Sequence, residues 1–104
     1  MTALSVKDGV QPRGLLDILC ALSVVSVPGQ PDPLTITSCF DGIHSKNSCH
    51  YRLAAVDVRS KDFPDLATKQ AWVQAIRLEL GTGFDVILES VGAPNEHFHL
   101  EFDP

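Results

Sequence analysis

The last ten residues of the chain, 95–104, decide its fold and read NEHFHLEFDP. From residue 97 to residue 102, a histidine or glutamate alternates with a phenylalanine or leucine. A period of two is typical of a half-buried strand, whose successive side chains point to opposite faces. We therefore expect Phe98, Leu100 and Phe102 to face the core. His97 and His99 then share the other face, where two histidines are either a solvated surface or the start of a metal site.

A second cluster lies upstream, where His50 and Asp57 are seven residues apart. On one straight strand, odd spacing would send the two side chains to opposite faces. They can share a metal ion if His50 lies in the loop before the strand, or if a bulge intervenes. The strand pattern is convincing only from Leu53 to Val58, which favours a loop position for His50.

Asp57 is a lone carboxylate between Val56 and Val58. A charge in such an apolar strand is costly unless it is paired or binds a metal. Two explanations therefore stay open for Asp57: an ion pair with Arg52 or Arg59, or a place in a metal site.

The motif His50-x6-Asp57, followed by Glu96-x-x-His99, resembles the zinc signature of D-alanyl-D-alanine carboxypeptidases and dipeptidases. Phage peptidoglycan endopeptidases and the hedgehog signalling domain share that metal-binding fold. The resemblance covers roughly residues 34–104. It implies an α+β, hedgehog/DD-peptidase-like fold, in which helices pack on one side of a small, mainly antiparallel sheet.

The resemblance also implies roles for single residues. His50, Asp57 and His99 would bind Zn²⁺, and Glu96 would be the general base that takes a proton from the attacking water. His97 would donate a hydrogen bond to the developing oxyanion, or serve instead as a zinc ligand. Glu89, at the end of the preceding strand, is the competing base. The implied activity is hydrolysis of a peptidoglycan stem peptide or D-Ala-containing cross-link.

Two positions depart from the family pattern. Leu53 stands where the family usually has glycine, three residues after the first zinc histidine. After the first strand, where many carboxypeptidases carry a substrate-anchoring arginine, residues 38–41 read SCFD. Either Arg52 or Lys46 replaces that arginine, or the substrate has no free carboxylate to hold. The second option favours an endopeptidase.

Composition sets the broad class of the protein. A length of 104 residues predicts a single domain, 1–104, and 44% hydrophobic residues predict a globular chain. The net charge of −5 argues against nucleic acid as a partner, because no basic stripe is present to neutralise phosphates. It also offers no attraction to an anionic membrane, and we expect a monomer.

Cys20, Cys39 and Cys49 make an odd number without CxxC spacing. This pattern predicts three reduced thiols, with a Cys39–Cys49 bridge as the alternative. The apolar stretch around residues 12–26 is interrupted by Asp17 and is too short to span a bilayer. We therefore read no signal peptide in it, and expect a cytoplasmic or phage-associated protein.

Hydrophobic spacing predicts the remaining elements. We expect a helix over 12–26, a short strand over 34–38, a polar loop over 39–49 that holds His44, and a strand over 53–59. A second helix begins after the N-cap Asp65 and ends near Gly81, before strands over 84–89 and from residue 97 onward. The expected core comprises Leu15, Leu19, Leu22, Ile36, Val56, Val73, Ile76, Val86, Leu88, Phe98 and Leu100, and the stripe of the second helix adds Leu66, Leu80 and, in one interpretation, Trp72.

Two other classes of function stay open at this point. The domain can bind zinc without catalysis, as a binding module or phage structural component. Alternatively, the His/Asp/His set is a coincidence in a metal-free interaction domain.

Overall fold

The computed structural model describes residues 14–42 and 53–103. These residues have α+β architecture, with two helices and a four-stranded antiparallel sheet. Among the described residues, no helix is long and apolar enough to cross a membrane. In chain order the elements are α1 (Leu15–Val24), β1 (Ile36–Gly42), β2 (Leu53–Arg59), α2 (Leu66–Leu80), β3 (Phe84–Glu89) and β4 (His97–Phe102).

The sheet has the strand order β1-β2-β4-β3, so the last strand lies between two earlier ones. In this register Val56 of β2 and Val86 of β3 both pair with Leu100 of β4. Because side chains alternate along each strand, this apolar row marks one face of the sheet. Residues one position away, such as Asp57 and His99, belong to the opposite face.

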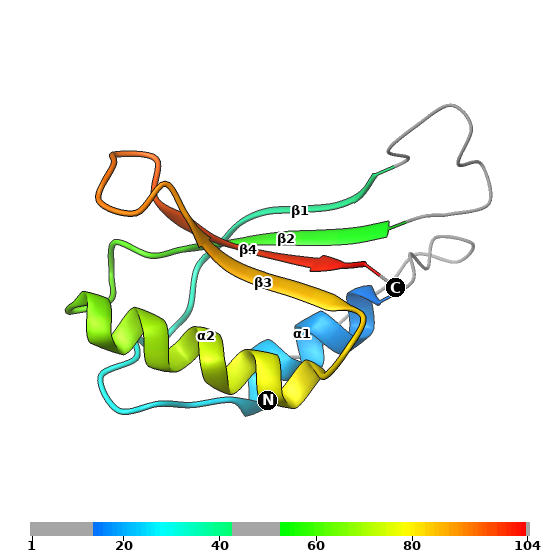
Figure 1. The fold of residues 1–104 in the computed structure, drawn as a ribbon, viewed down its shortest axis with the longest axis horizontal. Coiled ribbons are helices and arrows are strands. Elements are labelled where there is room, and N and C mark those ends of the chain that lie inside the picture. Colours follow the sequence, from blue (N-terminus) through cyan, green and yellow to red (C-terminus); the bar gives the residue numbers. More distant parts are fainter. Residues whose placement is uncertain (1–13, 43–52, 104) are drawn as a thin grey trace.

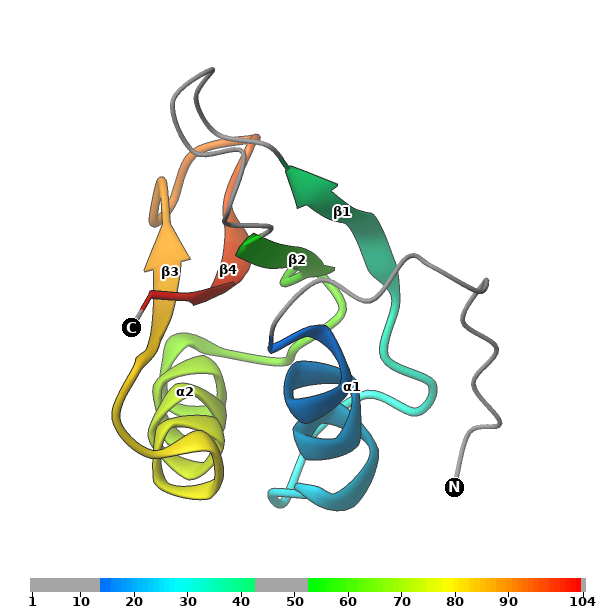
Figure 2. The same ribbon diagram turned by 90° about the vertical axis from the view of Figure 1, so that its right-hand side faces the viewer.

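Both helices cover the apolar face (Figures 1 and 2). Helix α1 contacts β2 and β4, while α2 packs against β3 and against α1. An aromatic cluster fills the centre of the core. The ring of Phe98 lies 4.9 Å from that of Phe63 and 4.5 Å from that of Trp72, and all three side chains are buried.

The ends of α2 follow the sequence signals. The Asp65 side chain accepts a hydrogen bond from the backbone N–H of Thr68 at 2.7 Å, as an N-cap does. At the other end Gly81 has φ 75°, and its N–H donates to the carbonyl of Arg77. Glycine is suited to this position because a side chain strains a positive φ.

Both ends of the first strand and two expected core residues need correction. Strand β1 extends to Gly42, so residues 39–42 are strand and not the start of the loop, and it begins at Ile36 instead of Leu34. Its register shifts between Ile36 and Ser38. With this irregularity at the sheet edge, Ile36 is 43% exposed and lies outside the core. Leu66 is also exposed, because it opens the first turn of α2.

The rest of the expected core is confirmed in large part. Val56, Val73, Ile76, Val86, Phe98 and Leu100 are buried, while Leu15, Leu22, Leu80 and Leu88 are partly buried and pack against this cluster. Leu19 is partly buried as well. Trp72 is fully buried, which confirms its interpretation as a core residue, and Ile18 is a core residue that the expected set left out.

Truncation of Phe98 tests this core. Its side chain is fully buried at the centre of the aromatic cluster, so Phe98→Ala should lower the free energy of unfolding by roughly 3–5 kcal/mol. Urea denaturation monitored by circular dichroism measures the loss. The exposed Val91→Ala is the matched control and should change stability little. A loss below about 1 kcal/mol for Phe98→Ala would contradict this account of the core.

Candidate metal centre

The face of the sheet away from the helices carries a cluster of polar side chains. Val56 and Val58 are buried on the core side, so the alternation of β2 directs Asp57 to the other face. On β4, His97 and His99 flank the buried Phe98 and share that face. The antiparallel register pairs Asp57 directly with His99. Residues 42 positions apart in the chain thus meet through sheet pairing.

Asp57, His97 and His99 form one compact group, and we call it the histidine centre. Each side chain offers a ligand atom, and these atoms all lie within 4.8 Å of one another. The Nδ1 of His99 is 2.7 Å from Oδ1 of Asp57, and the Nε2 of His97 is 3.9 Å from the same oxygen. All three side chains are partly buried, with 20–28% of their surface exposed.

The ring of His97 is oriented by the backbone. Its Nδ1 lies 2.8 Å from the carbonyl oxygen of Asn95, which can only accept a hydrogen bond. Nδ1 therefore donates the hydrogen bond in this contact, and Nε2 is directed toward Asp57. Metal-binding histidines are commonly held by a backbone carbonyl in this way.

Further carboxylates surround His99. Oε1 of Glu101 lies 3.4 Å from its Nε2, and Oε1 of Glu89 lies 4.0 Å from its Nδ1. Burial of the ring works to lower the pKa of His99. The hydrogen bonds to Asp57 and Glu101, with the charges of Asp57 and Glu89, outweigh that effect and raise its pKa above the ordinary value.

The donor set of the histidine centre fits a zinc ion. Two imidazole nitrogens and one carboxylate oxygen are typical protein ligands of a catalytic zinc site, which leaves a further position open. The orientation of His97 by a backbone carbonyl agrees with this use. Asp57 and His99 were both expected in such a site, and the structure brings them together with His97.

Glu96 does not belong to this group. Its Oε1 accepts from the Lys69 ammonium at 2.5 Å and from the Ser60 hydroxyl at 2.7 Å, and its Oε2 accepts from the N–H of Gly92 at 2.9 Å. These hydrogen bonds, that of Lys69 first, lower the pKa of Glu96 from 4.5 to about 2. The side chain is directed toward α2, which carries Lys69, whereas the histidine centre lies on the opposite face of the sheet.

Several expected residues lie outside the described part of the chain. His50, the first expected zinc ligand, is among them, as are His44, Cys49 and the two candidate anchors Lys46 and Arg52. The alternative for Asp57 was an ion pair with Arg52 or Arg59. Among the described residues Asp57 contacts the two histidines and not Arg59, whereas the pair with Arg52 stays a prediction. The alternation of β4 also predicts that Glu101 shares the face of His97 and His99, and its carboxylate does lie beside His99.

A purely acidic group lies farther along the same sheet, where Asp85, Glu101 and Asp103 approach one another. The hydrogen bond that the protonated Asp85 carboxyl donates to Asp103, with burial and the neighbouring negative charges, raises the pKa of Asp85. Carboxylates alone are a weaker indication of a metal site than the mixed donor set of the histidine centre.

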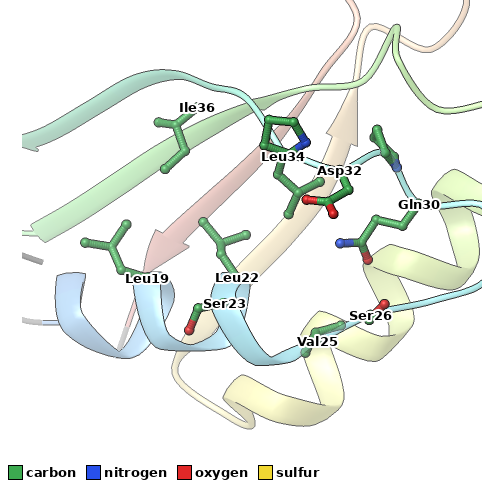
Figure 3. A pocket seen from close by; sticks show the side chains of 11 residues that line it. Leu19, Leu22, Ser23, Val25, Ser26, Gln30, Asp32, Leu34 and Ile36 are labelled. Carbon is green, nitrogen blue, oxygen red and sulfur yellow. The ribbon is translucent and has the colours of Figure 1, made fainter. Parts of the chain in front are cut away.

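The chain also has a pocket remote from the histidine centre. It has a volume of about 430 Å³ and lies between α1 and the segment that leads into β1 (Figure 3). Leu19, Leu22 and Leu34 give it an apolar lining, with Asp32 and Gln30 as polar groups. No residue of the histidine centre lines it, so the metal chemistry and this pocket are separate features.

Comparison of the chain with protein-family models, with curated proteins and with solved structures finds no match.

The contacts of Glu96 predict a pH-dependent contribution to stability. A carboxyl whose pKa is lower in the folded state stabilises the fold above its unfolded pKa, and this contribution is lost as the pH falls toward the folded value. Wild-type protein should therefore lose stability between about pH 5 and pH 2, and Glu96→Gln should lose less over that window. At pH 7 the variant should be less stable by about 1–3 kcal/mol.

Chemical denaturation at several pH values measures both effects. Glu79→Gln, on the exposed face of α2, is the control and should track the wild type. Parallel pH curves for Glu96→Gln and wild type would show that the contacts of Glu96 do not stabilise the fold.

Proposed function

We propose that this chain is a zinc-dependent hydrolase of the DD-peptidase type, with Asp57 and His99 as metal ligands. The observation that carries the proposal is the convergence of Asp57, His97 and His99 within 4.8 Å on one sheet face. In this proposal His97 is a third ligand, as the position of its Nε2 near Asp57 favours. His50 belongs to the same site by the resemblance of its motif.

In this proposal the residues of the histidine centre have different roles in holding the metal ion. A bound zinc ion supplies an acidified water and polarises the substrate carbonyl. Asp57 lies between both histidines and offsets the cation's charge, while Asn95 fixes the ring of His97. The half-buried setting of these side chains limits competing solvent and strengthens their electrostatic effect.

We assign the general base to Glu89 instead of Glu96. Glu89 is 40% exposed, and its carboxylate lies 4.0 Å from the ring of His99, within reach of a water beside the centre. Glu96 has a pKa of about 2 and keeps both carboxylate oxygens in hydrogen bonds. A carboxylate so acidic is a weak base, and it would have to break these contacts to act.

Two arguments support a substrate class: the resemblance to peptidoglycan peptidases, and the negative charges beside the histidine centre. The motifs around His50, Asp57 and His99 are similar to those of peptidoglycan peptidases. Glu89 and Glu101 beside the histidine centre disfavour a substrate with a free carboxylate at that place. An endopeptidase that acts on peptidoglycan cross-links therefore fits better than a strict carboxypeptidase.

The position of Glu96 favours one alternative. If Glu96 is the base that this type of site requires, its engagement by Lys69, Ser60 and Gly92 leaves the site without one. The domain would then be a non-catalytic zinc-binding module, acting in binding or as a phage structural component.

Zinc binding is the first test. Isothermal titration of the metal-free chain with zinc should give about one ion per chain. His99→Ala, Asp57→Ala and His97→Ala should each abolish tight binding, since each removes a ligand. Asp103→Asn, outside the centre, is the control and should bind as wild type does. His50→Ala tests the motif separately, and full binding by His97→Ala would return that residue to the oxyanion role.

Activity on purified peptidoglycan or on a D-Ala-D-Ala peptide is the second test. Glu89→Gln should keep the fold and zinc yet lower the rate by about 10²–10⁴-fold, because the amide cannot accept a proton. Glu96→Gln, measured at a temperature where it stays folded, should retain much of the activity. The reverse pattern would make Glu96 the base, and an inactive wild type with zinc bound would favour the non-catalytic module.

A further inference from the structure

Strand β3 forms one edge of the described sheet, above α2 (Figure 2). Its pairing with β4 fixes which backbone groups point away from the sheet. The carbonyl of Gly83 accepts from the N–H of Asp103 at 2.7 Å, so Gly83 points its backbone toward β4. Backbone direction alternates along a strand, and therefore Phe84, Val86 and Leu88 point theirs outward.

A second contact gives the same assignment. The Nε–H of Arg77, on α2, donates to the carbonyl of Val86 at 2.9 Å from outside the ladder. In the described part of the chain, the outward N–H and C=O groups of Phe84 and Leu88 have no neighbouring strand. Together with the N–H of Val86, these groups are a template for another extended chain, because a strand satisfies them at the right spacing, while the Val86 carbonyl shares its acceptor capacity with Arg77.

The surface below this edge is hollowed, and both apolar side chains and polar ones such as Gln70 and Gln74 line it. One hollow of about 600 Å³ lies between α2 and the end of β3, lined by Leu66, Leu88 and Val91 among others. A second, of about 470 Å³, continues past Phe84 at the other end of the strand. Leu66 and Val91, which both line the larger hollow, are 45% and 57% exposed. We call the edge and these hollows the β3 groove.

Arg77 lies between the two hollows and lines both. It is the only charged residue that lines the larger one, and no described carboxylate forms an ion pair with it. Its Nε is used by Val86, whereas the terminal guanidinium nitrogens remain donors that match a carboxylate. The groove therefore combines apolar contact, strand hydrogen bonds and the positive charge of Arg77, with Asp85 lining only the smaller hollow.

We propose that the β3 groove binds an extended peptide, which adds a strand to the sheet and places an acidic side chain against Arg77, between apolar neighbours. Side chains alternate along the added strand, so every second one enters the groove. Of these, the central one would be acidic and the flanking ones apolar. This role is independent of metal at the histidine centre, which lies on the other face of the sheet.

A second copy of this chain fits the groove poorly. Pairing of two β3 strands would bring two Arg77 side chains to one groove. It would also bring Asp85 and Glu89 of both copies to one face of the joined sheet, where like charges destabilise the pairing. The partner that complements the groove is therefore a peptide other than β3 itself, with an acidic side chain that pairs with Arg77.

Fluorescence anisotropy with the full chain tests the proposal. The probe is a labelled eight-residue synthetic peptide of alternating valine and threonine, with one central valine replaced by glutamate. We expect saturable binding, weakened about tenfold or more when lysine replaces the glutamate. Arg77→Glu should reverse this preference, and circular dichroism checks that the variant is folded.

N-methylated probes test the strand pairing without changing the protein. Methyl groups on the amides of one edge of the peptide should abolish binding, whereas methyl groups on the other edge should be tolerated. Amide shifts in the NMR spectrum should concentrate at Phe84, Val86 and Leu88. Equal tolerance of both methylated peptides, no saturation by about 1 mM, or a concentration-dependent dimer through β3 would each overturn the proposal.

Discussion

The antiparallel pairing of β2 with β4 is the interaction on which the rest of the structure depends. It places Val56 beside Leu100 on one face and Asp57 beside His99 on the other. The first pair anchors the core that both helices cover, and the second forms the histidine centre. A slip of one residue would reverse both faces at once, burying imidazoles and exposing Phe98. The stability of the core and the geometry of the candidate metal site therefore depend on the same register of β2 and β4.

Glu96 fixes the position at which β4 begins. It directly precedes β4, and its carboxylate ties the turn at Gly92 to Ser60 after β2 and to Lys69 on α2. Ser60 is almost fully buried, and the contacts of Glu96 with Ser60 and Lys69 are partly buried. The same network that fixes the start of β4 keeps Glu96 away from the histidines. In this chain a residue expected to be catalytic has contacts suited to a structural role.

Local patterns in the sequence were sufficient for much of the fold. The alternation over 97–102 predicted both faces of β4, and Asp65 and Gly81 predicted the ends of α2 because caps depend on neighbouring residues. The prediction that Ile36 is a core residue was wrong, because the register of an edge strand is set by the strand with which it pairs, and here that register is irregular. The partners of Glu96 could not be read from the sequence, since Lys69 is 27 residues away and meets it only through the tertiary fold.

The central claim is that Asp57, His97 and His99 form a metal centre. Nitrogen-15 NMR of the histidine rings during zinc titration tests it most directly, because a ring nitrogen that binds a metal changes its shift while its partner nitrogen stays protonated. The account predicts metal shifts at Nε2 of His97, with Nδ1 still donating to Asn95, and at one nitrogen of His99. Unchanged spectra for both rings, with zinc in excess, would contradict the claim.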